Sequence, residues 1–214
     1  MRIALQRRQG TCCIDVAFQS DENGITALFG PSGAGKSSII NMVAGLQRPD
    51  SGSIVLRGRC LFDSARGVNL PPEKRHVGYV FQEGLLFPHL SVRGNLLYGR
   101  RRNPAGDKGI DFDQVIHLLG IHDLLSRKPR NLSGGEKQRV AFGRAVLSNP
   151  DVLLMDEPLA SLDDARKEEM LPFIKELNVR LHIPILYVSH ALEEIRTLTG
   201  TILTLAQGKI VGAA

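Results

Sequence analysis

The sequence GPSGAGKS at residues 30–37 has the spacing of a phosphate-binding loop, in which a lysine and a serine end a glycine-rich turn. The apolar run ITALF at 25–29 precedes it and predicts a strand. Apolar residues at 39, 40, 43 and 44 follow with the spacing of one helix face. In such a unit, glycine N–H groups and the positive end of the helix dipole can face a polyphosphate. The alternative, a glycine-rich turn that binds nothing, is disfavoured by the strand before it and the helix after it.

Side-chain chemistry suggests roles for four residues. Lys36 would reach the β- and γ-phosphates of a nucleotide, and the Ser37 hydroxyl would hold Mg²⁺. Asp156 and Glu157 follow the apolar run at 152–155, so we expect them at the carboxyl edge of a parallel sheet, where ligands bind. Asp156 would hold Mg²⁺ through water, and Glu157 would act on the attacking water as general base. Alternatively, this acidic pair only caps the following turn.

A second glycine-containing segment, LSGGEKQ at 132–138, lies between the loop and the acidic pair in chain order. Ser133, Gly134 and Gly135 precede a run rich in helix formers, which predicts a second helix start able to bind an anion. This ordered trio of motifs resembles the ATPase subunits of ABC transporters over essentially the whole chain. The resemblance implies ATP and Mg²⁺ as ligands and ATP hydrolysis as the reaction.

The resemblance also implies roles for residues that would be unremarkable alone. Gln82 matches the Q-loop glutamine, which senses Mg²⁺ and the attacking water; alone it would be a surface glutamine. His190, after the apolar run at 185–189, matches the switch histidine that contacts the γ-phosphate; a lone histidine is more often structural. Residues 161–163 (SLD) match the D-loop, which communicates across a dimer. In this family the Ser133 segment faces the nucleotide of a second copy, so ATP would join two copies head to tail.

The residues expected to contact nucleotide are Gly30, Pro31, Ser32, Gly33, Ala34, Gly35, Lys36, Ser37, Ser38, Ser133, Gly134 and Gly135. Ser37, Gln82 and Asp156 are expected at the metal, and Glu157, His190 and Gln82 in catalysis.

Alternation of strand and helix patterns predicts an α/β fold, which the resemblance narrows to a P-loop NTPase (RecA-like) fold. We expect a mainly parallel sheet core, an antiparallel β subdomain and a helical subdomain inserted after the Q-loop. One ABC ATPase domain would occupy residues 1–214, with 1–82 and 150–214 as the nucleotide-binding core and 83–149 as the helical subdomain. The expected strands are 11–18, 25–29, 54–56, 77–81, 151–155 and 185–188, with a terminal hairpin at 201–206 and 209–211.

Composition narrows the class of protein. The 214 residues, 43% of them hydrophobic, suit one domain with one sizeable core. No apolar run approaches the roughly 18–20 residues that span a bilayer, and no signal core follows the N-terminus, so we expect a cytoplasmic protein. Three cysteines without metal spacing predict buried, reduced thiols. The net charge of +5 and the basic stretch at 100–102, beside the turn-rich 103–106, predict a solvated loop rather than a nucleic-acid patch.

Three segments make the chain resemble bacterial importer ATPases: LPPEKR at 70–75, VGYVFQ at 77–82 and FPHLSV at 87–92. The run at 25–29 and RGNLLYG at 93–99 look most like molybdate importer subunits. This resemblance implies import of molybdate, or tungstate, at the cytoplasmic face of the bacterial inner membrane. The implied partners are a second copy, a membrane permease and, indirectly, a periplasmic solute-binding protein. Molybdate subunits commonly carry a C-terminal oxyanion-binding domain, and since the sequence ends at Ala214 we expect such regulation to be absent or on another chain.

Other functions remain open at this point. The transported solute could be sulfate, a polyamine or another compound. ABC proteins of DNA repair or translation share the ATP motifs, but generally have long coiled-coil or zinc insertions or two ATPase units. A nucleotide-binding module without turnover is disfavoured because Glu157 and His190 are both present.

The sequence departs from the family where an aromatic residue normally stacks on adenine. Arg7, Arg8 and Gln9 occupy that region. A guanidinium could stack on the base instead, and we then expect weak discrimination between ATP and GTP.

Overall fold

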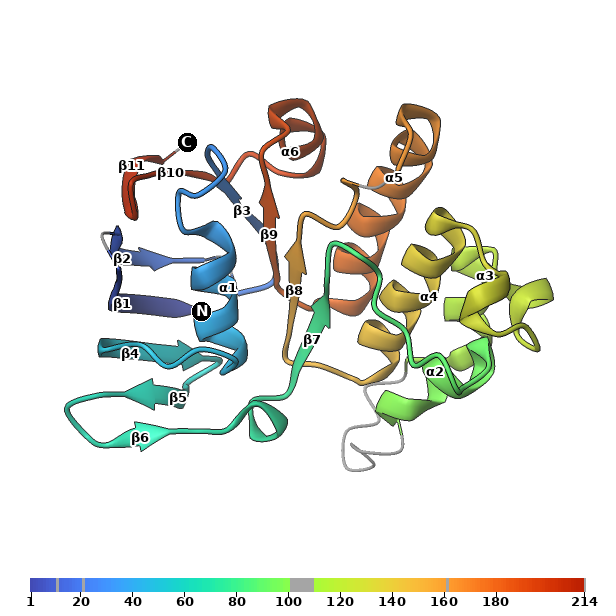
Figure 1. Cartoon of the computed structure of the whole chain (residues 1–214), viewed down its shortest axis with the longest axis horizontal. Helices are drawn as coiled ribbons and strands as arrows, with labels where there is room; N and C mark the ends of the chain where they lie inside the picture. The colour runs from blue at the N-terminus through green and yellow to red at the C-terminus, as the bar shows by residue number, and fades with distance from the viewer. Residues whose placement is uncertain (11, 21, 101–109, 161, 214) are drawn as a thin grey trace.

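A computed structural model describes the chain except residues 11, 21, 101–109, 161 and 214 (Figure 1). The described strands form one sheet in the order β6-β5-β4-β1-β2-β11-β10-β3-β9-β8-β7. They are β1 (Arg2–Gln9), β2 (Cys12–Gln19), β3 (Ile25–Phe29), β4 (Ser51–Leu56), β5 (Arg59–Asp63), β6 (Val68–Asn69), β7 (Val77–Val80), β8 (Val152–Asp156), β9 (Ile185–Ser189), β10 (Ile202–Ala206) and β11 (Lys209–Ala213). The helices are α1 (Lys36–Ala44), α2 (Val92–Arg100), α3 (Phe112–Leu119), α4 (Gly134–Leu147), α5 (Asp164–Leu181) and α6 (Leu192–Leu198), with short 3₁₀ turns at Pro72–Lys74, His122–Leu124 and Pro129–Asn131.

The strands from β10 to β7 form the parallel half of the sheet, with β10 beside β3 and then β9, β8 and β7. The apolar runs of β3, β8 and β9 are buried on both faces, as covered parallel strands require. In β8, Leu153 and Met155 pack into a core with α2–α6, whereas Val152 and Leu154 pack into a second core with α1. The sheet therefore separates two cores, and its carboxyl edge carries the residues after β3, β8 and β9. The predicted α/β P-loop fold is confirmed.

The strands β1, β2, β4, β5 and β6 form the antiparallel half. The apolar patterns of the sequence did not predict β1, β5 or β6. In β1, the buried Ile3 and Leu5 alternate with exposed neighbours, and β5 and β6 are short strands in which polar residues break the apolar run. The expectation of buried thiols was wrong for Cys13, which is exposed on β2, while Cys60 is half-buried. Thr11, the expected first residue of β2, lies outside the described residues.

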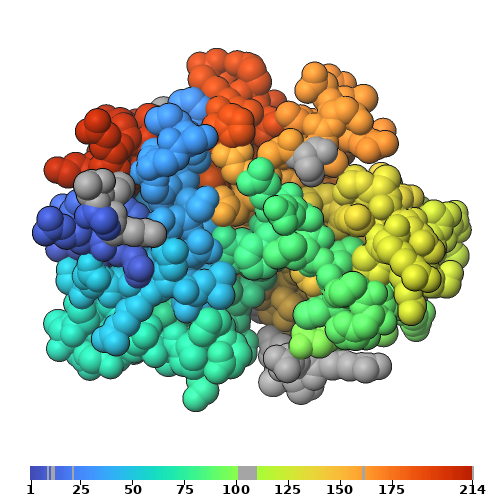
Figure 2. Space-filling view, in the orientation of Figure 1, coloured from blue at the N-terminus to red at the C-terminus, as the bar shows by residue number. Residues whose placement is uncertain are grey.

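The helices of residues 92–147 lie at one end of the sheet, beside β7 (Figure 1). Figure 2 shows them (green to yellow) on the side of the molecule opposite β1–β5 (blue to teal). Helix α4 approaches α2 and α3 closely, because a Cβ at Gly143 would lie 2.7 Å from Leu96 and 2.8 Å from Leu119. None of the described helices is long and apolar enough to cross a membrane. The loop expected at 101–106 lies outside the described residues.

Candidate active site

The loop at 30–37 connects β3 to α1 and leaves the helix start open. An added Cβ at Gly30 would collide with the Leu205 carbonyl oxygen, so only glycine fits there. Gly35 precedes α1 with a φ of +101°, and no described side chain caps the helix. The N–H groups of the first turn therefore point free toward the pocket, which is the geometry of an anion site.

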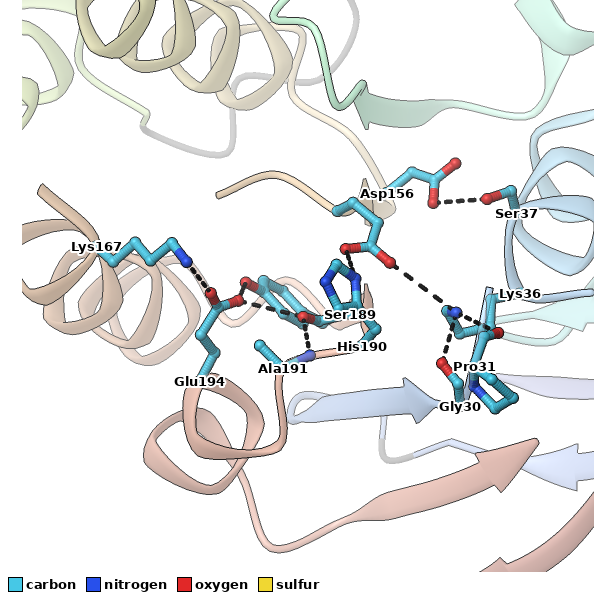
Figure 3. A network of polar contacts seen from close by, with 12 residues as sticks. Gly30, Pro31, Lys36, Ser37, Asp156, Lys167, Ser189, His190, Ala191 and Glu194 are labelled. Carbon is cyan, nitrogen blue, oxygen red and sulfur yellow. Dashed lines mark hydrogen bonds and ion pairs between the residues drawn. The ribbon is translucent and has the colours of Figure 1, made fainter. Parts of the chain in front are cut away.

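Lys36 places a buried ammonium group beside this loop. Its Nζ donates to the carbonyl oxygens of Gly30 at 2.7 Å and Pro31 at 3.0 Å (Figure 3). The same Nζ lies 3.9 Å from Glu157 Oε1. An incoming phosphate would offer this ammonium group stronger, charged partners than the two carbonyls.

The Asp156 carboxylate, at the end of β8, accepts from two hydroxyl groups. Ser37 Oγ donates to Oδ1 at 3.0 Å, and Tyr79 Oη lies 3.3 Å from Oδ2. Burial raises the pKa of Asp156 above its ordinary value, against the lowering effect of these two hydrogen bonds. A hydroxyl and a carboxylate oxygen are the donors that Mg²⁺ prefers, so Ser37 and Asp156 fit the expected metal.

Glu157 follows β8 directly and meets His190, which follows the neighbouring strand β9. His190 Nδ1 lies 2.6 Å from Glu157 Oε2. The Glu157 side chain is only 14% exposed, and its backbone φ of +48° is in the left-handed region, where a non-glycine residue is uncommon. The Glu157 amide donates to Val188 O at 2.9 Å, which ties this turn to β9. The carboxylate is therefore held between Lys36 and His190.

A pocket of about 530 Å³ brings most of the predicted site residues together. Its lining comes from the loop and the start of α1, from β2, from Gln82 after β7 and from the turns after β8 and β9. The lining residues are Ile14, Ser32, Gly33, Gly35, Lys36, Ser37, Ser38, Gln82, Glu157 and His190. Of the remaining loop residues, Gly30 and Pro31 bind Lys36 through their carbonyls, and Ala34 is buried.

Ile14 lines the pocket although no sequence motif pointed to it. It lies on β2, and its side chain would be 3.2 Å from a Cβ at Gly35. Arg7 and Arg8, expected near the base, do not line the pocket in the described part of the chain. The Arg7 guanidinium donates instead to the Arg48 carbonyl oxygen, and the Arg8 amide to Asp50. The alternation of apolar and polar residues at 14–16 (IDV) was the available sequence signal for Ile14.

Ser133, Gly134 and Gly135 lie at the start of α4, in a second region. Ser133 Oγ accepts from the Glu136 amide at 3.3 Å, and the Glu136 carboxylate accepts from the Ser133 amide at 2.6 Å. This reciprocal pair is a capping box. A smaller pocket of about 270 Å³ here is lined by Ser133, Gly135, Glu136, Arg139, Leu162, Arg166, Glu169 and Met170.

The two pockets share no residue of the described part of the chain. Gly134 is exposed at the helix start. Of the predicted D-loop, Leu162 lines the second pocket and Asp163 caps α5, while Ser161 lies outside the described residues. One chain therefore keeps the Ser133 segment apart from the phosphate-binding loop.

Residues 13–160 match the ABC transporter family, so this chain belongs to that family. Among its relatives are proteins named molybdenum import ATP-binding protein ModC. That of Rhodospirillum rubrum is 57% identical over 211 residues, which are 99% of this chain and 57% of the relative. That of Pectobacterium atrosepticum is 53% identical over 98% of this chain and 58% of the relative. The chain thus spans less than two thirds of the length of these relatives.

Solved structures support the fold. The dimeric structure of MJ0796, a bacterial ABC transporter cassette, matches with a TM-score of 0.81 and 24% identity, covering 100% of this chain and 97% of that chain. A post-hydrolysis state of the same cassette, bound to ADP and phosphate, matches with a TM-score of 0.78. At this identity the similarity shows the fold alone.

Proposed function

We propose that this chain is the ATP-hydrolysing subunit of an ABC importer that energises molybdate uptake through a separate membrane permease. The observation that carries the proposal is the Glu157 carboxylate, held between Lys36 and His190 beside the Asp156–Ser37 pair. A base, a cation for phosphate and, next to them, a pair of oxygen atoms suited to a metal are the parts that phosphoryl transfer to water needs.

In this mechanism the loop N–H groups and Lys36 bind the β- and γ-phosphates of ATP. Ser37 and Asp156 would hold Mg²⁺, with Gln82 near it, and the bound ion would supply positive charge to stabilise the phosphates. Glu157 accepts a proton from the attacking water while the water oxygen bonds to the γ-phosphorus. The bond between this phosphorus and the ADP oxygen breaks, and ADP leaves. His190, which contacts Glu157 in the structure without nucleotide, contacts the γ-phosphate when ATP is bound and helps to orient the water.

Two copies would act together, because the signature residues, from Ser133 to Gly135, lie outside the phosphate pocket of their own chain. In the proposed dimer each copy presents them to the nucleotide of the other. ATP then closes the dimer and hydrolysis reopens it, which is a shift in population driven by one phosphate. The dimer would work at the cytoplasmic face of the membrane, with a permease and, indirectly, a periplasmic solute-binding protein.

Molybdate, with tungstate as a second substrate, is proposed from the name of relatives that are 57% and 53% identical. Importers of sulfate or a polyamine are the second candidate, since the oxyanion does not touch this subunit. Non-transport ABC ATPases are disfavoured by the identity with importer subunits over nearly the whole chain.

A cell in which the only copy carries Lys36→Ala tests the substrate. We expect loss of high-affinity molybdate uptake and recovery of molybdoenzyme activity when excess molybdate is supplied. The purified subunit should neither bind free molybdate nor change its ATP turnover when molybdate is added. If the cell takes up molybdate normally but fails on sulfate or a polyamine, the importer class survives and the substrate assignment is wrong.

A further inference from the structure

A second polar network lies behind the turn that carries His190. Its centre is Glu194, whose side chain is only 11% exposed in the first turn of α6. Ser189 Oγ lies 3.2 Å and Tyr187 Oη 3.3 Å from the Glu194 Oε2 atom. Lys167 Nζ lies 3.1 Å from the other oxygen, Oε1. Both oxygens of this carboxylate are therefore occupied.

The network fixes the backbone on both sides of His190. Ser189, which is buried, accepts from the Ala191 amide at 3.0 Å through the same hydroxyl that meets Glu194. The hydroxyl has one proton to donate, and the carboxylate accepts it, which leaves a lone pair for the amide. Figure 3 shows the contact between Ser189 and Ala191 beside His190. The orientation of the imidazole thus depends on where Glu194 holds Ser189.

Lys167 connects this turn to the region of the second pocket. It belongs to the first turns of α5, and its amide donates to Asp163 O at 3.0 Å. The preceding residue, Arg166, lines the second pocket, and its side chain would lie 3.3 Å from a Cβ at Gly135. Neighbouring residues of one helix turn therefore reach the signature segment on one side and Glu194 on the other.

We infer that Lys167 and Glu194 are positioning residues for hydrolysis: their ion pair holds the turn at Ser189–Ala191 so that His190 meets Glu157. The pair also joins that turn to the first turns of α5, beside the second pocket. This inference rests on the proposed ATPase function.

The ion pair between Lys167 and Glu194 is partly shielded from water, which strengthens the attraction between the two charges. Lys167 is 25% and Glu194 11% exposed, so water screens the pair less than a surface pair. The competing partner of Lys167, Asp164, lies 3.9 Å away and is fully exposed. Loss of either charge would leave the other partly buried without its partner. If the ion pair is lost and His190 shifts slightly, turnover can fall by as much as about a hundredfold.

The test compares turnover with nucleotide binding in four variants. Glu194→Gln keeps an oxygen acceptor and loses the charge, and Lys167→Met keeps most of the side-chain length. We expect each to lower kcat about tenfold or more while the Kd for MgATP changes by less than about twofold, because only the orientation of His190 changes. The double variant should be no worse than the poorer single variant, as for residues that act as one unit. Lys167→Arg, which keeps the positive charge, should retain most of the wild-type turnover.

Glu193→Gln is the matched control, since Glu193 is the preceding residue of α6, is 89% exposed and pairs with Arg196 of the same helix. Its turnover should equal that of the wild type. Additive losses in the double variant, or parallel losses in kcat and MgATP affinity, would overturn the inference and indicate general destabilisation.

A measurement that does not depend on ATP turnover separates this inference from the proposed function. The imidazole nitrogen resonances of His190, assigned with a His190→Gln variant, should shift in Glu194→Gln and in Lys167→Met but not in Glu193→Gln. Unchanged resonances would show that the network does not position His190, whatever the ATPase activity. If the resonances shift but the wild-type protein hydrolyses no ATP, the contact stands and the proposed function fails.

Discussion

At the scale of single residues, Glu157 is the group on which the proposed chemistry depends. Glu157→Gln keeps the shape of the side chain and removes the base, so ATP should still bind while turnover falls about 10²–10⁴-fold. Because hydrolysis is what reopens the proposed dimer, the variant should also accumulate an ATP-bound dimer. Steady-state hydrolysis and gel filtration with ATP measure both effects. Near-normal hydrolysis by this variant would remove Glu157 from the role of base.

Tyr79 is a second residue with a specific expected effect, because it holds Asp156 from the side opposite Ser37. Its hydroxyl lies 2.9 Å from Asn41 Oδ1 and 3.3 Å from Asp156 Oδ2. Burial, and then the charge of Asp156, raise the pKa of Tyr79, so the hydroxyl keeps its proton as donor.

Tyr79→Phe removes the hydroxyl and with it the contacts to Asp156 and Asn41. A hydrogen bond contributes roughly 0.5–1.5 kcal/mol, so we expect the Mg²⁺ concentration for half-maximal ATP turnover to change about two- to tenfold, with little change in metal-free nucleotide binding. A Mg²⁺ titration of the ATPase measures the change. Tyr98→Phe, on α2 outside the pocket, is the control and should titrate like the wild type. An unaltered Mg²⁺ dependence in Tyr79→Phe would show that Asp156 needs no help from this hydroxyl.

At the scale of elements, the start of α4 has a stability that depends on pH. The Ser133 amide, as the largest influence, lowers the pKa of the Glu136 carboxyl below its ordinary value. A lowered pKa in the folded state adds stability above the unfolded pKa, and this stability is lost as the pH falls through the folded pKa.

Glu136→Gln keeps the side-chain acceptor and removes its charge, so it should cost about 0.3–1 kcal/mol near neutral pH, the typical effect of a charge near a helix N-terminus. The difference from the wild type should shrink as the pH falls through the lowered pKa of Glu136. Urea unfolding at a series of pH values measures it, with Glu168→Gln, an exposed glutamate of α5, as the control. A difference that stays constant on acidification would mean that the carboxylate charge does not contribute to the cap.

The elements also show which parts of the fold the sequence could predict. The strand at 25–29 was predicted at its observed bounds, because a buried parallel strand is an uninterrupted apolar run that ends at a glycine. The strand β1 was missed, since a half-buried strand alternates and its polar residues hide the pattern. Arg75 shows a different limit. It is 1% exposed, and its guanidinium binds the carbonyls of Met42 and Val43 at the end of α1 and that of Leu70 after β6. Only the packed structure brings those carbonyls together.

The site was predictable to a similar degree. Residues whose role depends on local geometry, such as Lys36 in its loop, could be found from spacing alone. The contact of Lys167 with Glu194 joins positions 27 residues apart through packing of α5 on α6, and no spacing rule indicates it.

At the scale of the whole molecule, the two pockets raise the question of how they cooperate. They have no described lining residue in common. If the second pocket serves the nucleotide of another copy, Ser133→Arg should keep ATP binding at the loop and block the dimer by crowding the partner's γ-phosphate. Ser133→Ala removes the same helix cap, at about 0.5–2 kcal/mol, without the added bulk, and should still dimerise.

Mixing two inactive variants gives the sharper test of this arrangement. In a head-to-tail dimer of Lys36→Ala with Ser133→Arg, one composite site combines both defects and the other has an intact loop and an intact signature segment. The mixture should therefore regain ATP turnover at one of two sites, whereas neither variant alone is active. A control mixture of Lys36→Ala with Glu157→Gln places both defects in loop pockets, so neither of its composite sites is intact and it should stay inactive. If both pockets of a site came from the same chain, mixing could not restore activity, because each chain carries one defect. An inactive mixture of stable, folded variants would therefore refute the head-to-tail arrangement.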